Sequence, residues 1–131
     1  MQSFSKILLN KQYARIGDGV SNLIYSLALF TATGEVKKTK LPGSILATAL
    51  KASGLRSRLP SRQDKYGLSD AAEALIGYAW LKGKIEIKDV AISIASLINS
   101  KVPLKDNFEN LVLGFTLLLK KVVEELSKEV E

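Results

Sequence analysis

The chain has 131 residues and a net charge of +6 at pH 7, and its length predicts one domain over residues 1–131 with a substantial core. Hydrophobic residues make up 47% of it and charged residues 24%, as in ordinary folded proteins. It contains no cysteine and no histidine, which excludes disulfides, zinc–thiolate sites, thiol nucleophiles and a histidine general base.

Helix signals run through nearly the whole chain and strand signals are weak, so the sequence predicts an all-α fold. A first long helix is expected over residues 11–30, where apolar residues recur close to every 3.6 positions, and residues 31–34 should end it. A second helix should follow Pro42 and Gly43 and stop at Gly54.

The next stretch, residues 56–67, is polar and basic and contains Pro60, which predicts a loop. Ser69 is a favourable N-cap residue, so a third helix is expected to begin there and to reach about residue 81. Asp70 would then lie in the first turn, where it suits the helix dipole.

A fourth helix is expected over residues 88–99. Asp106 and Glu109 form an approximate capping box before a final helix over residues 108–128. Residues 111–119 of that helix are apolar around nearly the whole circumference, so its centre should be covered on every side, either by the rest of the chain or by a second copy.

Nothing in the sequence predicts a membrane partner. The N-terminus lacks the pattern of a secretory signal, and the longest apolar run, Leu111–Leu119, is far shorter than the about 20 residues that a membrane-spanning helix needs. We therefore expect a cytoplasmic protein.

Two of the expected helices carry carboxylates beside small residues. Gly17 and Gly19 flank Asp18 inside the first long helix, although a glycine there costs about 0.5–1 kcal/mol relative to alanine. This pattern indicates a close approach of another backbone. In the third helix, Asp70 and Glu73 project from one face. In the same helix, Ala71, Ala74 and Gly77 give a surface of small residues on which another helix could lie unusually close.

If these two helices cross, Asp18, Asp70 and Glu73 meet. Like charges held so close destabilise a fold unless a cation compensates them, and oxygen ligands alone predict Mg²⁺ or, alternatively, Mn²⁺. The pattern thus indicates a metal-dependent nuclease. The alternative is structural, with Asp70 as a helix N-terminal acid, Glu73 on the surface and Asp18 paired with Arg15 or Lys11.

Positive charge is concentrated between residues 37 and 65, where eight basic residues accompany a single acid, Asp64. Such a concentration is typical of a polyanion-binding surface, although a solvated face is the alternative. The candidate phosphate contacts are Lys37, Lys38, Lys40, Arg56, Arg58, Arg62 and Lys65.

The two acidic segments resemble those of the ribonuclease III family. Residues 16–20, Ile-Gly-Asp-Gly-Val, are similar to the Gly-Asp-Ala core of the family signature. Residues 69–77, Ser-Asp-Ala-Ala-Glu-Ala-Leu-Ile-Gly, are similar to the second motif, Asp-x-x-Glu-Ala-Leu-x-Gly. The similarity runs from about residue 11 to residue 119. Because no double-stranded-RNA-binding domain is appended, the chain is most similar to the compact mini-ribonuclease III type.

This resemblance implies a ribonuclease III-like helical endonuclease domain, acting on double-stranded or structured RNA as a homodimer with a magnesium-dependent acidic centre in each subunit. The products would carry 5′-phosphate and 3′-hydroxyl ends. By position, Asp18, Asp70 and Glu73 would be the metal ligands and catalytic acids. Such a module reads A-form RNA by shape, so sequence preference should be weak.

The chain departs from the family pattern at two positions. The full signature has a glutamate four residues before its aspartate, where this chain has Ala14, although mini-ribonuclease III members can also have alanine there. Those members often have a glutamate one turn after the aspartate, where this chain has Asn22. Glu35 is either a replacement acid or a solvated loop residue. These departures keep two alternatives open. One is a catalytically inactive RNA-binding or ribosome-associated relative, and the other is a helical interaction domain with no RNA role.

Overall fold

The computed structural model describes residues 3–36, 40–60 and 63–129, without the side chains of residues 65 and 66. Within these residues there are six α-helices, two short 3₁₀ segments and no strand, which confirms the predicted all-α fold. The α-helices are α1 (Phe4–Leu8), α2 (Lys11–Thr33), α3 (Gly43–Ala52), α4 (Lys65–Leu81), α5 (Ile87–Ala95) and α6 (Phe108–Ser127). The 3₁₀ segments are η1 (Leu55–Arg58) and η2 (Leu104–Asn107).

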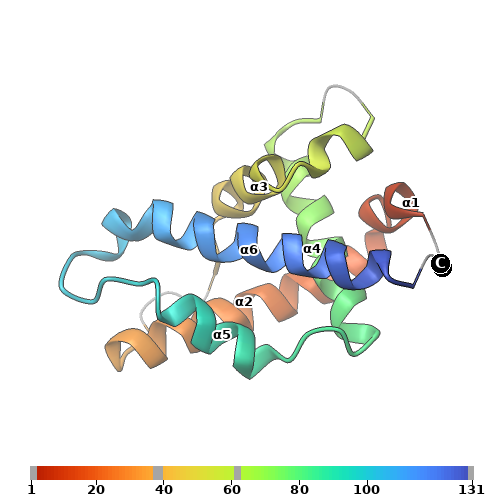
Figure 1. The fold of residues 1–131 in the computed structure, drawn as a ribbon. Coiled ribbons are helices and arrows are strands. Elements are labelled where there is room, and N and C mark those ends of the chain that lie inside the picture. Colours follow the sequence, from red (N-terminus) through yellow and green to blue (C-terminus); the bar gives the residue numbers. More distant parts are fainter. Residues whose placement is uncertain (1–2, 37–39, 61–62, 130–131) are drawn as a thin grey trace.

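Helix α4 forms the centre of the fold. It packs most extensively against α2 and α3 and also contacts α1 and α6. Figure 1 shows α6 passing in front of α4, with α3 on one side of α6 and α2 and α5 on the other. A helix that is apolar on nearly every side is buried by such neighbours. In α4, the fully or almost fully buried apolar residues include Leu68, Ala71, Ala72, Ala74, Leu75, Ile76 and Ala79.

Helix α6 is less enclosed than its sequence predicts. Leu111 and Phe115 are buried, but Leu113 and Leu117 remain 46% and 52% exposed. The rest of the described chain therefore covers only part of the circumference of α6. The expectation that its centre is covered on every side is wrong for the single chain, because α4 rather than α6 occupies the centre.

Helix α4 begins one turn earlier than predicted. The carboxylate of Asp64 accepts a hydrogen bond from the backbone N–H of Gly67 at 2.8 Å and thereby caps the helix. Ser69 is consequently a buried residue inside the helix rather than its N-cap, and Asp70 lies beyond the first turn. The predicted loop over residues 56–67 is likewise wrong at both ends, where η1 and α4 intrude.

Other helix ends differ more modestly. Helix α2 continues past Phe30 to Thr33 and ends at Gly34, whose φ of 81° gives the left-handed cap. Helix α5 stops at Ala95 rather than at residue 99. Helix α1 was not predicted from the sequence.

The predicted capping box of Asp106 and Glu109 is absent, since no side chain caps α6. Instead, the buried amide of Asn107 accepts a hydrogen bond from the N–H of Asn99 at 2.7 Å and donates to the carbonyls of Asn99 and Pro103. These bonds join the end of the α5 segment to the start of α6.

No helix in the part of the chain that the structure describes combines the length and the apolar character needed to cross a membrane.

Candidate functional site

Helices α2 and α4 cross with their backbones in contact. A β-carbon placed on Gly17 of α2 would overlap the backbone carbonyl of Glu73 on α4. Conversely, a β-carbon placed on Gly77 would overlap the carbonyl of Tyr13 and would lie 2.7 Å from the backbone nitrogen of Gly17. The prediction that glycine marks a close approach is thus confirmed for Gly17. It is wrong for Gly19, which is exposed and whose β-carbon would meet no atom within 4 Å.

This crossing brings the three predicted acids to one cavity of about 710 Å³. Asp18 comes from α2, and Asp70 and Glu73 come from successive turns of α4. Residues 52 and more positions apart in the sequence therefore share one solvent-facing hollow. The other residues that line it are Lys11, Ala14, Arg15, Lys40, Leu41, Gly43 and Ser69.

Asp18 is surrounded by donors. Its Oδ1 accepts hydrogen bonds from Asn22 Nδ2 and from Lys40 Nζ, both at 3.2 Å. A hydrogen bond from Glu73, followed by the charge and hydrogen bond of Lys40 and the amide of Asn22, lowers the pKa of Asp18 below its ordinary value despite some burial. Asp18 is therefore ionised at neutral pH.

Glu73 behaves in the opposite way. Burial raises the pKa of Glu73 to about 8, and the hydrogen bond with Asp18 together with the negative charges of Asp18 and Asp70 acts in the same direction. Glu73 therefore holds a proton at neutral pH and shares it with Asp18 in a hydrogen bond. A partly buried carboxyl with a pKa near neutrality is a typical feature of functional sites.

Asp70 lies at the rim of the cavity. Its Oδ2 is 3.7 Å from Lys11 Nζ, and its side chain is 48% exposed. The structural alternative for the acids is thus corrected in its details. Asp18 pairs with Lys40 rather than with Arg15 or Lys11, Lys11 pairs with Asp70, and Glu73 is partly buried.

The donor set fits a hard divalent cation in its chemistry. It consists of oxygen ligands only, and burial together with the neighbouring carboxylates keeps the carboxyl group of Glu73 protonated at neutral pH. Among the residues that the structure describes, however, no three carboxylates lie close enough together to bind one metal ion. Asp18 and Glu73 form a hydrogen-bonded pair, while Asp70 stands beside them with its own lysine.

The positions where the chain departs from the family pattern fall in the same place. Ala14 lines the cavity one turn before Asp18, and Asn22 contacts Asp18 one turn after it. Glu35 is exposed beyond the end of α2 and does not line the cavity, as expected of a loop residue. Asn22 and Leu41 are site residues that sequence reasoning did not identify as such, although the spacing of Asn22 from Asp18 predicts their contact on one helix face.

The predicted RNA-contacting residues are only partly described. Lys37, Lys38 and Arg62 lie outside the described residues, as does the side chain of Lys65. Lys40 points into the acidic cavity.

Two further members of this set belong to η1 and have partners within the protein. Arg56 Nη1 donates to the carbonyl of Pro60 at 3.2 Å, and the guanidinium of Arg58 lies 5.2 Å from the ring centre of Phe4.

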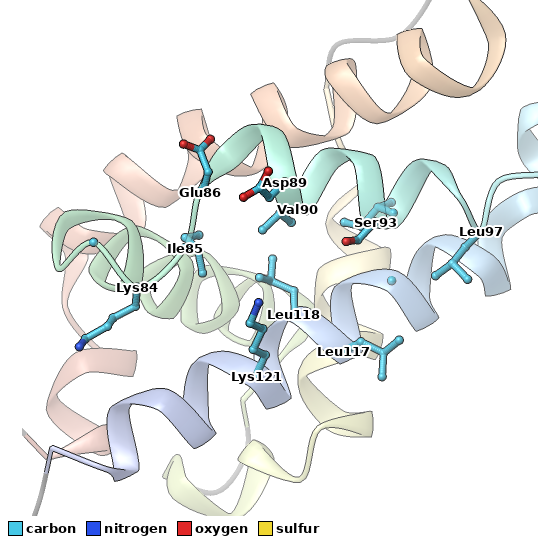
Figure 2. Close-up of a pocket in the computed structure, with 13 residues that line it drawn as sticks. Lys84, Ile85, Glu86, Asp89, Val90, Ser93, Leu97, Leu117, Leu118 and Lys121 are labelled. Atoms are coloured by element: carbon cyan, nitrogen blue, oxygen red, sulfur yellow. The ribbon is translucent and has the colours of Figure 1, made fainter.

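A second cavity, of about 730 Å³, lies between α5 and α6 (Figure 2). Its lining combines apolar residues of both helices with the charged residues Lys84, Glu86, Asp89 and Lys121 (Figure 2). Glu86 caps α5 through the N–H of Lys88, and Lys84 pairs with Glu129 at 3.0 Å. None of the three acids predicted from the sequence lines this second cavity, so the candidate site is the acidic cavity at the crossing of α2 and α4.

Comparison with known proteins identifies the family of the chain. A search of curated protein sequences gave no match. The family described as Ribonuclease III matches residues 11–128, which cover α2 to α6 and hence both helices of the acidic cavity. The chain belongs to the ribonuclease III family.

Proposed function

We propose that the protein is a metal-dependent endoribonuclease that hydrolyses phosphodiester bonds in double-stranded or structured RNA and leaves 5′-phosphate and 3′-hydroxyl ends. The observation that carries this proposal is the convergence of Asp18, Asp70 and Glu73 on one cavity in a chain of the ribonuclease III family. These three residues are the proposed metal ligands and catalytic acids, and Mg²⁺ or Mn²⁺ is the proposed cofactor.

The three acids have different tasks in this proposal. A bound cation would lower the pKa of its water and stabilise the charge of the cleaved phosphate. Asp18 is already ionised and offers its carboxylate directly. Glu73 must lose its proton before it can bind a cation, so neutral to mildly alkaline pH favours the loaded site. Asp70 adds negative charge at the rim.

RNA binding is assigned to the basic segment. Lys37, Lys38, Lys40, Arg56, Arg58, Arg62 and Lys65 are the proposed contacts with backbone phosphates. Their concentration in one segment supports an electrostatic, shape-based mode of recognition. Lys40, one member of this set, lines the acidic cavity and so connects the proposed phosphate contacts with the proposed cleavage centre.

The protein is further proposed to act as a homodimer. Support comes from α6, whose Leu113 and Leu117 are exposed one turn apart on the same face. A second copy of the chain that packs against this face would bury the exposed apolar side chains of α6.

A catalytically inactive RNA-binding relative is the second candidate. One observation favours it: Lys40 and Lys11 already pair with Asp18 and Asp70, so the acids are partly compensated without a metal ion. Asn22 also stands where mini-ribonuclease III members often have a glutamate.

The deciding experiment is cleavage of a duplex RNA with Mg²⁺ and with EDTA. The parent should cut only with Mg²⁺, and Asp18→Asn or Glu73→Gln should lower the rate at least about 100-fold, as expected for loss of a metal-binding carboxylate. Glu109→Gln, an exposed acid of α6, serves as the control and should cut normally. If the parent binds RNA with salt-dependent affinity but does not cut, the inactive relative is the correct reading. If the parent neither binds nor cuts RNA, the protein is a helical interaction domain with no RNA role.

A further inference from the structure

We infer that Lys40 is a resident counter-charge of the acidic cavity, held in place by Asn22, and that a divalent cation must displace it in order to bind. This inference rests on the proposed function, because it concerns how the same cavity accepts its metal ion. It gives Asn22 the role of a positioning residue that no family motif supplies.

The backbone next to Lys40 is anchored at two points. The side chain of Leu41 is 4% exposed and is part of the hydrophobic core. The N–H of Leu41 donates a hydrogen bond to Asn22 Oδ1 at 2.7 Å. The backbone next to Lys40 is therefore hydrogen-bonded to α2 at Asn22, one turn beyond Asp18.

The amide nitrogen of Asn22 donates a hydrogen bond to Asp18. Asn22 Nδ2 lies 3.2 Å from Asp18 Oδ1, the same oxygen that Lys40 Nζ approaches at 3.2 Å. One amide side chain thus connects the carboxylate with the backbone that carries its counter-ion. A glutamate at position 22 would have no N–H to donate to Asp18 and would instead repel it.

The consequence concerns the competition between two cations. The Lys40 side chain is 75% exposed, so its ion pair is weak and can open. While it is closed, however, Asp18 Oδ1 is occupied by two donors, and the ammonium group of Lys40 adds one positive charge to those of Lys11 and Arg15, which also line the cavity. The free energy needed to open this contact, together with repulsion from the nearby ammonium group, therefore lowers the affinity of the cavity for a divalent ion.

The first test measures Mn²⁺ binding by counting free Mn²⁺ with electron paramagnetic resonance. Lys40→Met should bind Mn²⁺ about 3- to 10-fold more tightly than the parent, given the strength of an exposed ion pair. Lys40→Arg should bind like the parent, and Asn22→Ala should change affinity in the same direction as Lys40→Met. The matched control is Lys84→Met, which removes an equal charge paired with Glu129 outside this cavity and should leave the affinity within about 2-fold.

The second test is metal-free and uses thermal unfolding in EDTA. Lys40→Met should lower the melting temperature by about 1–3 °C when Asp18 is present and should have no effect in the Asp18→Asn background. High salt should abolish this difference. The double-mutant cycle therefore isolates the contact between Lys40 and Asp18 without reference to cleavage.

The outcomes separate this inference from the proposed function. If the parent binds Mn²⁺ but Lys40→Met binds it no more tightly than Lys84→Met, or if the cycle shows no coupling, the counter-charge inference is overturned while the nuclease proposal stands. If no variant binds Mn²⁺, the inference and the proposed metal site are overturned together.

Discussion

The α-carbon of Gly17 lies against the backbone carbonyl of Glu73, so that no β-carbon would fit between the two helices. The residue after Gly17 is Asp18, and the side chain of Glu73 extends from the other helix at this same contact. The crossing that excludes a methyl group therefore also brings the two carboxyl groups into hydrogen-bonding contact. The close crossing of α2 and α4 is therefore the cause of both the tight backbone packing and the interaction between Asp18 and Glu73.

Replacing Gly17 with alanine should destabilise the protein by about 3 kcal/mol or more, because the added methyl group meets backbone atoms that cannot rotate away. Gly19→Ala is the matched control on the same helix. Its β-carbon meets no atom, so the better helix propensity of alanine should stabilise the protein by about 0.5–1 kcal/mol. Urea unfolding measures both. Equal effects of the two substitutions would contradict the tight crossing.

Stability of the metal-free protein should fall as pH rises. The pKa of Glu73 is raised to about 8 from its ordinary 4.5, so between these values the folded state binds more protons than the unfolded state. By linkage, the free energy of unfolding decreases with pH across this window. The lowered pKa of Asp18 acts below about pH 4 and does not enter it.

Glu73→Gln removes this titration. In EDTA the variant should therefore gain stability relative to the parent between pH 5 and pH 8, as measured by its melting temperature. The control is Glu109→Gln, which removes an exposed carboxylate of α6 and should keep the slope of the parent. A parent whose pH slope equals that of Glu73→Gln would show that burial of Glu73 has no energetic effect.

Arg56 offers a test of the basic segment. Arg56→Ala should weaken binding to duplex RNA by a similar factor for unrelated sequences and should reduce the slope of log affinity against log salt by about one unit. Lys88→Ala, an exposed lysine of α5 outside the basic segment, is the charge-matched control. Fluorescence anisotropy at several salt concentrations gives both quantities. An equal loss in the two variants would mean that net charge alone governs binding.

Leu117 tests the proposed dimer. Leu117→Glu places a charge on the exposed apolar face of α6 and should convert a dimer into a folded monomer. Light scattering coupled to gel filtration reports the mass, and circular dichroism checks the fold. Leu81→Glu alters a comparably exposed leucine at the end of α4 and should leave the dimer intact. A monomeric parent, or a variant that remains dimeric, argues against an α6 interface.

Several parts of the molecule were predictable from local signals. Helix α2 was expected because its apolar residues follow the helical period, and its close approach to a neighbour was expected because a buried glycine inside a helix has a cost that contact must offset. The acid motifs identified the right elements for the cavity. The error at α4 arose because Ser69 and Asp64 are both good N-cap residues, and only the native hydrogen bond distinguishes them.

The sequence by itself therefore determined the helical class, the positions of the three acids and the glycine that permits the crossing, because periodicity, spacing and side-chain size are properties of short segments. Only the tertiary structure decided that Lys40 rather than Arg15 faces Asp18, that Asn22 connects them, and that Glu73 keeps a proton. These outcomes depend on which distant segments meet and on how much water remains between them, and neither can be read from neighbouring residues alone.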